Sequence, residues 1–126
     1  MLLNREISMT KSDDLSQAYL RFLNLVSAIK GLPDLDAVER RVLDVLAGIW
    51  ATGAKVTVLE AMDLAPGTSP TTVHRRLKSL RERGLIDLKE DESDNRVKYV
   101  VPTRATRAYF AKLGRALDRA TRERAD

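Results

Sequence analysis

The hydrophobic period of the chain changes at Gly84, and this change constrains the fold more than any other feature. Before Gly84, Val73, Leu77 and Leu80 recur at the spacing of one helix face. After Gly84, apolar and polar side chains alternate with a period near two over residues 85–90 and again over residues 96–101. The polar residues 91–95 lie between these two stretches. A helix followed at once by a β-hairpin is therefore expected.

Four further helices are expected from apolar stripes and helix-breaking residues. They cover residues 13–31, 36–52, 57–63 and 103–126. Ser12 or Asp13 is the expected N-cap of the first, and Asp36, Thr57 and Thr103 are the expected N-caps of the others. The apolar stripe of the first helix contains Leu15, Ala18, Tyr19, Phe22, Leu25, Val26 and Ile29.

The order of these elements predicts a mainly α fold with a small β-hairpin wing. Short helix, turn, helix and hairpin form a winged helix-turn-helix, and helices 13–31 and 103–126 flank it. A chain of 126 residues suits one domain, expected over 13–126, with residues 1–12 as a flexible N-terminus. The segment "KVT" (residues 55–57) is expected to be a very short strand.

The helix over 69–84 is the candidate functional element. Ser69 and Pro70 form a strong start signal, and Gly84 ends the helix. Hydroxyl, imidazole and cationic side chains can bond base edges and phosphates. The candidate DNA-binding residues of this helix are Ser69, Thr71, Thr72, His74, Arg75 and Lys78. The alternative interpretation is an ordinary core helix with a solvated, charged outer face.

Composition excludes several classes of function. The net charge is +4, and the excess positive charge lies within residues 69–84 and 104–126, which permits a polyanionic partner. No cysteine is present and His74 is the single histidine, so no disulfide, thiol chemistry or multi-histidine metal site is expected. We expect no enzyme, no cofactor and no membrane partner. The start lacks the apolar segment of a signal peptide, so a cytoplasmic protein, nucleoid-associated when bound to DNA, is expected.

Residues 94–103 carry a second motif. This stretch resembles the wing motif of the multiple-antibiotic-resistance regulator (MarR) family, which reads Asp-x-Arg, five residues, then Leu-Thr. Asp94, Arg96 and Thr103 match the motif at the same spacing, and Pro102 stands in place of the usual leucine. The helix pattern is also similar to that family, with matches at Val73, Arg75, Leu80, Gly84 and Leu85. The resemblance implies that Arg96 enters the minor groove while Asp94 orients it. The alternative is an ion pair that merely closes the hairpin turn.

The resemblance also implies a homodimer held by helices 13–31 and 103–126. In the last helix, Tyr109 or Phe110, Leu113, Leu117 and Ala120 would form a narrow seam. The expected function is a dimeric repressor that reads an inverted-repeat operator in double-stranded DNA through helix 69–84, with a wing over 85–102. The alternative is a winged-helix protein-interaction module without DNA binding.

Two further expectations concern the partners. The family implies a small-molecule effector of unknown identity, for which Tyr19, Arg21 and Trp50 are candidate lining residues. Five acids lie within residues 87–94, so the wing is expected to contribute less to DNA binding than the helix does.

Overall fold

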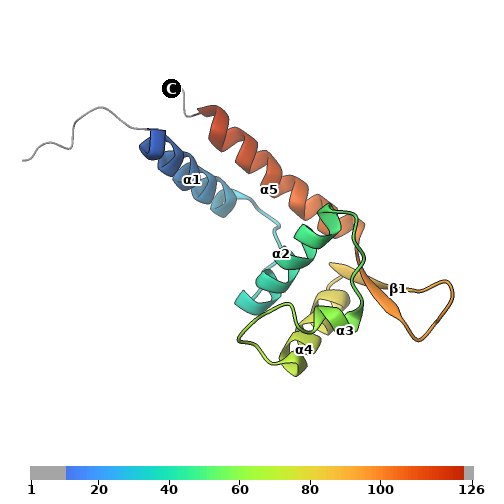
Figure 1. Ribbon diagram of the computed structural model, residues 1–126. Coiled ribbons are helices and arrows are strands. Elements are labelled where there is room, and N and C mark those ends of the chain that lie inside the picture. The colour runs from blue at the N-terminus through green and yellow to red at the C-terminus, as the bar shows by residue number, and fades with distance from the viewer. Residues whose placement is uncertain (1–10, 124–126) are drawn as a thin grey trace, which may run out of the picture. The chain divides into compact units, whose positions relative to one another are not determined.

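The computed structural model describes residues 11–123, which form two compact units (Figure 1). One unit contains the described residues of 1–32 and 109–126, and the other is Pro33–Ala108. The predicted flexible N-terminus lies outside the described residues except for Lys11 and Ser12, which are helical. No helix within residues 11–123 is both long and apolar enough to cross a bilayer.

The first unit pairs helix α1 (Lys11–Ala28) with helix α5 (Arg104–Arg122) from Tyr109 onward. Arg21 Nε donates to the carbonyl of Ala120 at 3.0 Å, which places a cation at the negative C-terminal end of α5. The prediction that Ser12 or Asp13 is an N-cap is wrong, because both lie inside α1.

The predicted apolar faces of this unit are covered only in part within the chain. In α5 the buried apolar residues are Tyr109, Ala116 and Ala120, whereas Leu117 is 54% exposed, so its place in a seam with a second copy stays a prediction. Ala116 and Ala120, four residues apart, share the side of the helix that is covered within the chain, and Leu117 lies 100° further round. In α1, Ala18 is buried while Leu15 and Tyr19 of the predicted stripe are exposed.

The second unit contains helices α2 (Ala37–Ala51), α3 (Val58–Ala61) and α4 (Pro70–Glu82), strands β1 (Ile86–Glu90) and β2 (Lys98–Pro102), and the start of α5. The predicted N-caps Asp36, Thr57 and Ser69 are confirmed, since each side chain accepts from the backbone amide three residues ahead. Gly84 adopts a φ of 76°, a left-handed conformation that ends α4 without the strain a side chain would add.

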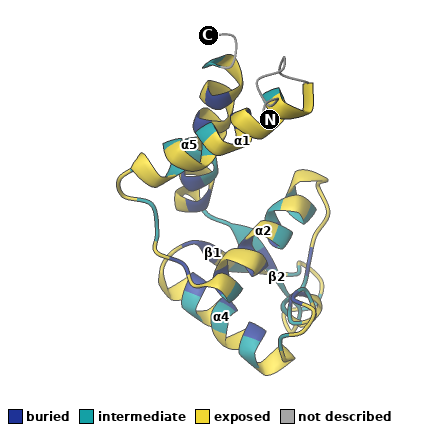
Figure 2. Cartoon of the chain, turned by 90° about the vertical axis from the view of Figure 1, so that its left-hand side faces the viewer, coloured by how far each residue is buried: buried dark blue, intermediate teal, exposed yellow. Residues whose placement is uncertain are grey.

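The core of this unit lies where α2 and α4 face each other and the hairpin (Figure 2). Val42, Leu43 and Leu46 of α2 are fully buried, as are Val73 and Leu80 of α4. Burying these aliphatic side chains is the main favourable contribution to folding, at about 1.5–3 kcal/mol for each. Ile86 and Val100 of the hairpin add to the same core.

The predicted hairpin is confirmed as an antiparallel pair of strands in which Leu88 lies opposite Val100. The predicted short strand over residues 55–57 is reduced to one bridge between Thr57 and Tyr99 and a bond from Val100 N to Val56 O at 2.9 Å. The hairpin is joined to α5 by hydroxyls: Thr103 bonds the carbonyl of Gly84, and Thr106 bonds the carbonyl of Leu85. Thr103 also caps α5, as expected, by accepting from the amide of Thr106.

Candidate nucleic-acid interface

The N-terminus of α4 is organised by two hydroxyls. Ser69 Oγ accepts from the amide of Thr72 at 3.2 Å and donates to Thr72 Oγ1 at 2.9 Å. The hydroxyl hydrogen of Ser69 is therefore already engaged within the cap. Pro70 at the first helical position lacks an amide hydrogen that would otherwise have no partner.

The exposed face of α4 carries most of the predicted site residues. Thr71, His74, Arg75 and Lys78 are exposed, whereas Thr72 is half-buried. Val73, Leu77 and Leu80 point to the core, as the sequence pattern predicts. The helix therefore presents hydroxyl, imidazole and cationic groups on one side and is held by its apolar side.

The five cations of this segment are not equivalent. Arg76 Nε lies 2.8 Å from Asp36 Oδ2, Arg83 Nη1 lies 3.4 Å from Glu39 Oε1, and Arg81 Nε lies 3.7 Å from Asp87 Oδ1. The other two cations are Arg75 and Lys78, and among residues 11–123 no carboxylate forms an ion pair with either of them. The unneutralised positive charge of α4 therefore lies on its exposed face, at Arg75 and Lys78.

The turn of the hairpin holds the second predicted motif. Arg96 Nε and Nη2 donate to the two carboxylate oxygens of Asp94 at 3.0 and 3.2 Å, and Asp94 also accepts from the Arg96 amide. These hydrogen bonds lower the pKa of the Asp94 carboxyl and raise that of the Arg96 guanidinium. The Arg96 side chain is 87% exposed, so the pair fixes its direction while leaving its outer edge free.

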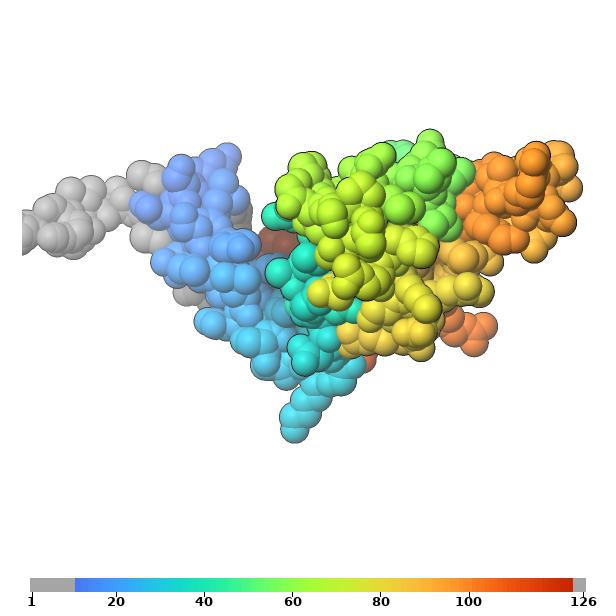
Figure 3. Space-filling model, turned by 90° about the horizontal axis from the view of Figure 1, so that it is seen from below, coloured from blue at the N-terminus to red at the C-terminus, as the bar shows by residue number. Residues whose placement is uncertain are grey.

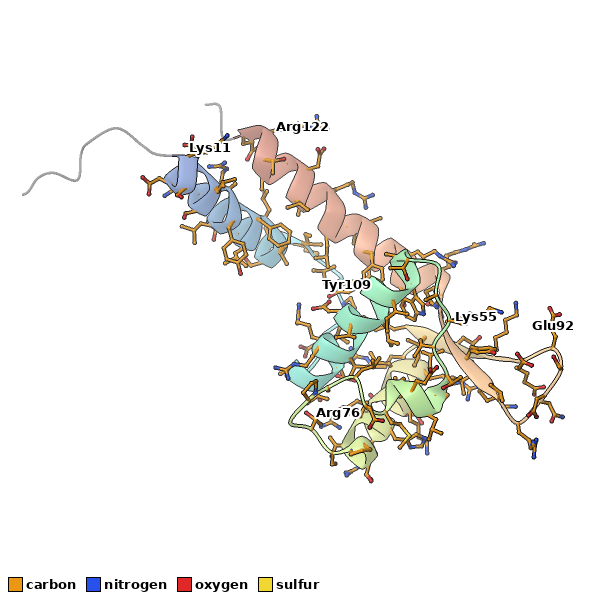
Figure 4. All side chains as sticks on the ribbon, viewed as in Figure 1. Lys11, Lys55, Arg76, Glu92, Tyr109 and Arg122 are labelled. Atoms are coloured by element: carbon orange, nitrogen blue, oxygen red, sulfur yellow. The ribbon has the colours of Figure 1, made fainter. Side chains whose placement is uncertain are left out.

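Most of the acids near the hairpin turn have local partners. Asp91 accepts from the amides of Ser93 and Asp94 and from the Tyr99 hydroxyl, and this hydroxyl bond is the main cause of its lowered pKa. Glu90 pairs with Lys98 at 3.0 Å. Glu92 lies at the far end of the hairpin (Figure 4). Within the wing, Glu90 and Asp94 are therefore paired with cations, whereas Asp91 is held by neutral hydrogen-bond donors.

A hollow of about 420 Å³ lies between α3, α4 and the hairpin. His74 of α4 and Arg96 of the hairpin both line it, so the structure brings one predicted residue of the helix together with one of the wing. Figure 3 shows α4 and the hairpin on the same face of this unit. The remaining lining residues are Thr57, Val58, Leu59, Met62, Val97 and Lys98.

The sequence interpretation missed a polar network behind α4. Glu39 is 5% exposed, and its carboxylate accepts from Ser79 Oγ at 2.8 Å besides pairing with Arg83. Arg76 lies on the same side of α4 and is labelled in Figure 4. Two features of the sequence indicate this network. One is the Asp36-x-x-Glu39 capping box. The other is that Ser79 and Arg83 follow Arg76 by three and seven residues, which places all three on one side of a helix.

Solved structures of transcriptional regulators share this fold. No protein-family model matches the chain, and no curated protein matches it. A regulator from Thermotoga maritima aligns with a TM-score of 0.60 at 18% identity, over 86% of this chain and 70% of that one. A MarR-like regulator from the same organism aligns with a TM-score of 0.57 at 20% identity, over 91% and 80%.

A third similar structure is BpsR from Bordetella bronchiseptica, which aligns with a TM-score of 0.50 at 20% identity, over 94% of this chain and 81% of that chain. The DNA binding of BpsR is regulated by 6-hydroxynicotinic acid. Together these likenesses show that the fold of this chain is the winged helix found in MarR-like regulators.

Proposed function

We propose that the protein is a transcriptional regulator that binds double-stranded DNA in a sequence-specific manner through α4. The observation that carries this proposal is the exposed, unneutralised pair Arg75 and Lys78 on α4, next to a hollow shared with the wing. An α-helix fits the major groove of B-form DNA, and a basic exposed face supplies the attraction to phosphate.

In this mechanism the residues divide by their geometry. Thr71, His74 and Arg75 face outward near the start of α4 and would contact base edges, with Arg75 suited to guanine. Ser69, Thr72 and Lys78 would bind the phosphate backbone and hold the register. Arg96, oriented by Asp94, would enter the adjacent minor groove, where the negative potential favours arginine.

The direct test is binding of the purified chain to duplex DNA. Selection from random duplexes should enrich one sequence, and the affinity for it should fall steeply between 50 mM and 200 mM salt. No enrichment, together with no binding to any duplex at low salt, would reject the proposal.

We further propose that the protein is a homodimer and that its operator is an inverted repeat. Leu15, Tyr19, Leu20 and Leu23 of α1 are 43–59% exposed, and such a cluster of large apolar side chains on one helix favours burial against a second copy. A dimer would present two recognition helices one DNA turn apart, about 34 Å. Repression would then follow where the operator overlaps a promoter.

Sedimentation analysis tests the dimer. Leu23→Glu should shift the chain to the monomer, because a buried unpaired carboxylate disfavours the interface. Leu59→Glu, which alters an exposed side chain of α3, is the matched control and should leave the dimer intact. A monomeric wild type at micromolar concentration would reject this part of the proposal.

We also propose that a small organic anion controls the DNA binding of the protein. A groove of about 290 Å³ in the first unit combines an apolar floor with three cations, and an aromatic acid matches that chemistry. The acid that regulates BpsR belongs to this class. The groove is lined by Leu25, Ile29, Lys112, Arg115, Ala116 and Arg119. Neither Tyr19 nor Arg21 lines it, and Trp50 belongs to the second unit.

Thermal melts with a panel of aromatic carboxylates test this control. A binding acid should raise the melting temperature of the wild type and change its affinity for DNA. Both effects should be lost in Arg115→Ala. A panel that leaves the melting temperature unchanged would contradict it.

A protein-interaction module is the second candidate function, and one observation favours it. Leu59 is 76% exposed and stands at the hollow between α3 and the wing, where an apolar side chain of a protein partner would fit. Binding to a specific protein without any binding to duplex DNA at low salt would support this candidate over the first.

A further inference from the structure

The capping box at the start of α2 holds α4 as well as α2. Within the box, Asp36 Oδ1 accepts from the amide of Glu39 at 2.7 Å, and Glu39 Oε1 accepts from the amide of Asp36 at 2.9 Å. The second oxygen of each carboxylate faces α4. Asp36 Oδ2 lies 2.8 Å from Arg76 Nε, and Glu39 Oε2 accepts from Ser79 Oγ at 2.8 Å.

The two carboxylates differ in burial, and the difference decides which one holds α4. The side chains of Asp36 and Arg76 are 46% and 37% exposed, so water screens this pair and its contribution is small. The Glu39 side chain is 6% exposed. A buried carboxylate is tolerated only when donors surround it, and Ser79 of α4 and Arg83, the C-cap of α4, supply them.

These contacts supply the directional restraint that apolar packing lacks. Val73, Leu77 and Leu80 hold α4 against α2 through contacts that have little preference for a particular rotation of the helix. Hydrogen bonds and ion pairs weaken steeply when their angle changes. Ser79 and Arg83 lie one turn apart beside the apolar face, so Glu39 resists rotation of α4 about its axis.

The geometry points to Glu39 as a positioning residue for DNA recognition. Through Ser79 and Arg83 it fixes the rotation of α4, and thereby the directions of the exposed Arg75 and Lys78. This inference rests on the proposed function. Specific binding depends on the direction of those side chains, whereas non-specific binding depends on charge. Loss of the Glu39 carboxylate therefore lowers specific affinity while non-specific affinity stays constant or rises, because the substitution removes a negative charge.

The experiment compares Glu39→Gln and Ser79→Ala with the wild type, using the duplex enriched by selection and a duplex of scrambled sequence. Fluorescence anisotropy gives both Kd values at a temperature where circular dichroism shows each variant to be folded. Val42→Ala is the matched control, because Val42 is fully buried in α2 and lies outside the polar network.

Glu39→Gln should raise the Kd for the selected duplex about tenfold and leave that for the scrambled duplex unchanged or lower. Ser79→Ala should raise the specific Kd several-fold, and the double variant should lose less than the sum, because the two residues share one interaction. Val42→Ala should retain the wild-type ratio of the two Kd values. Where Glu39→Gln does not fold, Ser79→Ala carries the test.

If Glu39→Gln and Ser79→Ala both keep the wild-type ratio of the two Kd values, the role of Glu39 is overturned while the proposed function stands. An equal loss of the ratio in Val42→Ala would overturn it too, since general destabilisation would then suffice. A wild type that binds neither duplex would overturn the proposed function, and the role of Glu39 in recognition with it.

Discussion

The indole N–H of Trp50 donates a hydrogen bond of 3.0 Å to the backbone carbonyl of Val100. The amide of Val100 donates in turn to the carbonyl of Val56 at 2.9 Å. Both polar groups of one residue in β2 are thus bonded to the segment that runs from the end of α2 to α3. The wing is therefore anchored to the helices through β2, and the single tryptophan of the chain lies at the anchor.

Trp50→Phe should lower the free energy of unfolding by about 1–3 kcal/mol, because the carbonyl of Val100 loses its partner while remaining shielded from water. Chemical denaturation followed by circular dichroism measures this. Hydrogen exchange of the hairpin amides should also accelerate in the variant. Leu59→Ala, at an exposed position, should change stability by no more than about 0.5 kcal/mol. Unchanged stability and exchange in Trp50→Phe would contradict the anchoring role.

Arg75→Ala and Lys78→Ala should each weaken DNA binding, and in different ways. An arginine that contacts a base supplies about 1–3 kcal/mol and discrimination at one position of the site. A lysine that contacts phosphate weakens binding to all sequences alike and lowers the salt slope by about 1. Titrations of both variants at several salt concentrations, against selected and scrambled duplexes, separate the two roles.

Arg122→Ala is the control for this pair, since it removes one positive charge from α5, where Arg122 pairs with Asp118. It should leave the affinity for the selected duplex nearly unchanged. Wild-type affinity in both Arg75→Ala and Lys78→Ala would remove α4 as the recognition helix.

Arg96→Ala should weaken binding mainly to duplexes that have a narrow minor groove beside the site. Narrow A·T-rich grooves concentrate negative potential, which attracts an inserted guanidinium. Affinities for duplexes with A·T-rich and G·C-rich flanks should therefore differ for the wild type and become similar in the variant. Asp94→Ala should cause a smaller loss, since Arg96 keeps its charge and loses only its orientation. An unchanged preference in Arg96→Ala would favour a role for the pair in closing the hairpin turn.

The hydrogen bond of 2.8 Å between Tyr99 and Asp91 should make the stability of the hairpin depend on pH at both extremes. The bond lowers the pKa of Asp91, so its contribution is present above the usual aspartate range near 4 and is lost as pH falls through the lowered value. The bond raises the pKa of Tyr99, so its contribution is present below about 10 and is lost as pH rises through the raised value.

Tyr99→Phe should remove both pH dependences while retaining the ring over which Lys55 lies at 5.2 Å. Hairpin amide exchange measured at pH 3, 7 and 10.5 checks this, with the largest difference between wild type and variant expected at pH 7. An equal difference at all three pH values would show that the ring substitution, and not the hydrogen bond, is responsible.

The parts of this fold that depend on short stretches of chain follow from the sequence. Asp36, Thr57, Ser69 and Thr103 were all predicted as N-caps, because capping joins a side chain to an amide only three residues away. The hairpin was predicted for a similar reason, since the alternation of its side chains is a property of each strand. The exposed face of α4 followed from the helical period of its apolar residues.

The tertiary structure alone decided which of these surfaces are free. The helical period selects Arg75 and Lys78 as candidates, but the sequence does not show which of the five cations of residues 75–83 have a carboxylate partner, and Leu117 is a better candidate for burial than Ala116. In the structure three of the cations are paired, one of them with Glu39, which lies 44 residues away in the chain, and Ala116 is buried instead of Leu117. Local pattern determines which side chains share a helix face, but the elements packed against that face determine whether a charge is neutralised or an apolar group is covered. Those neighbours come from distant parts of the chain and are brought together only by the fold.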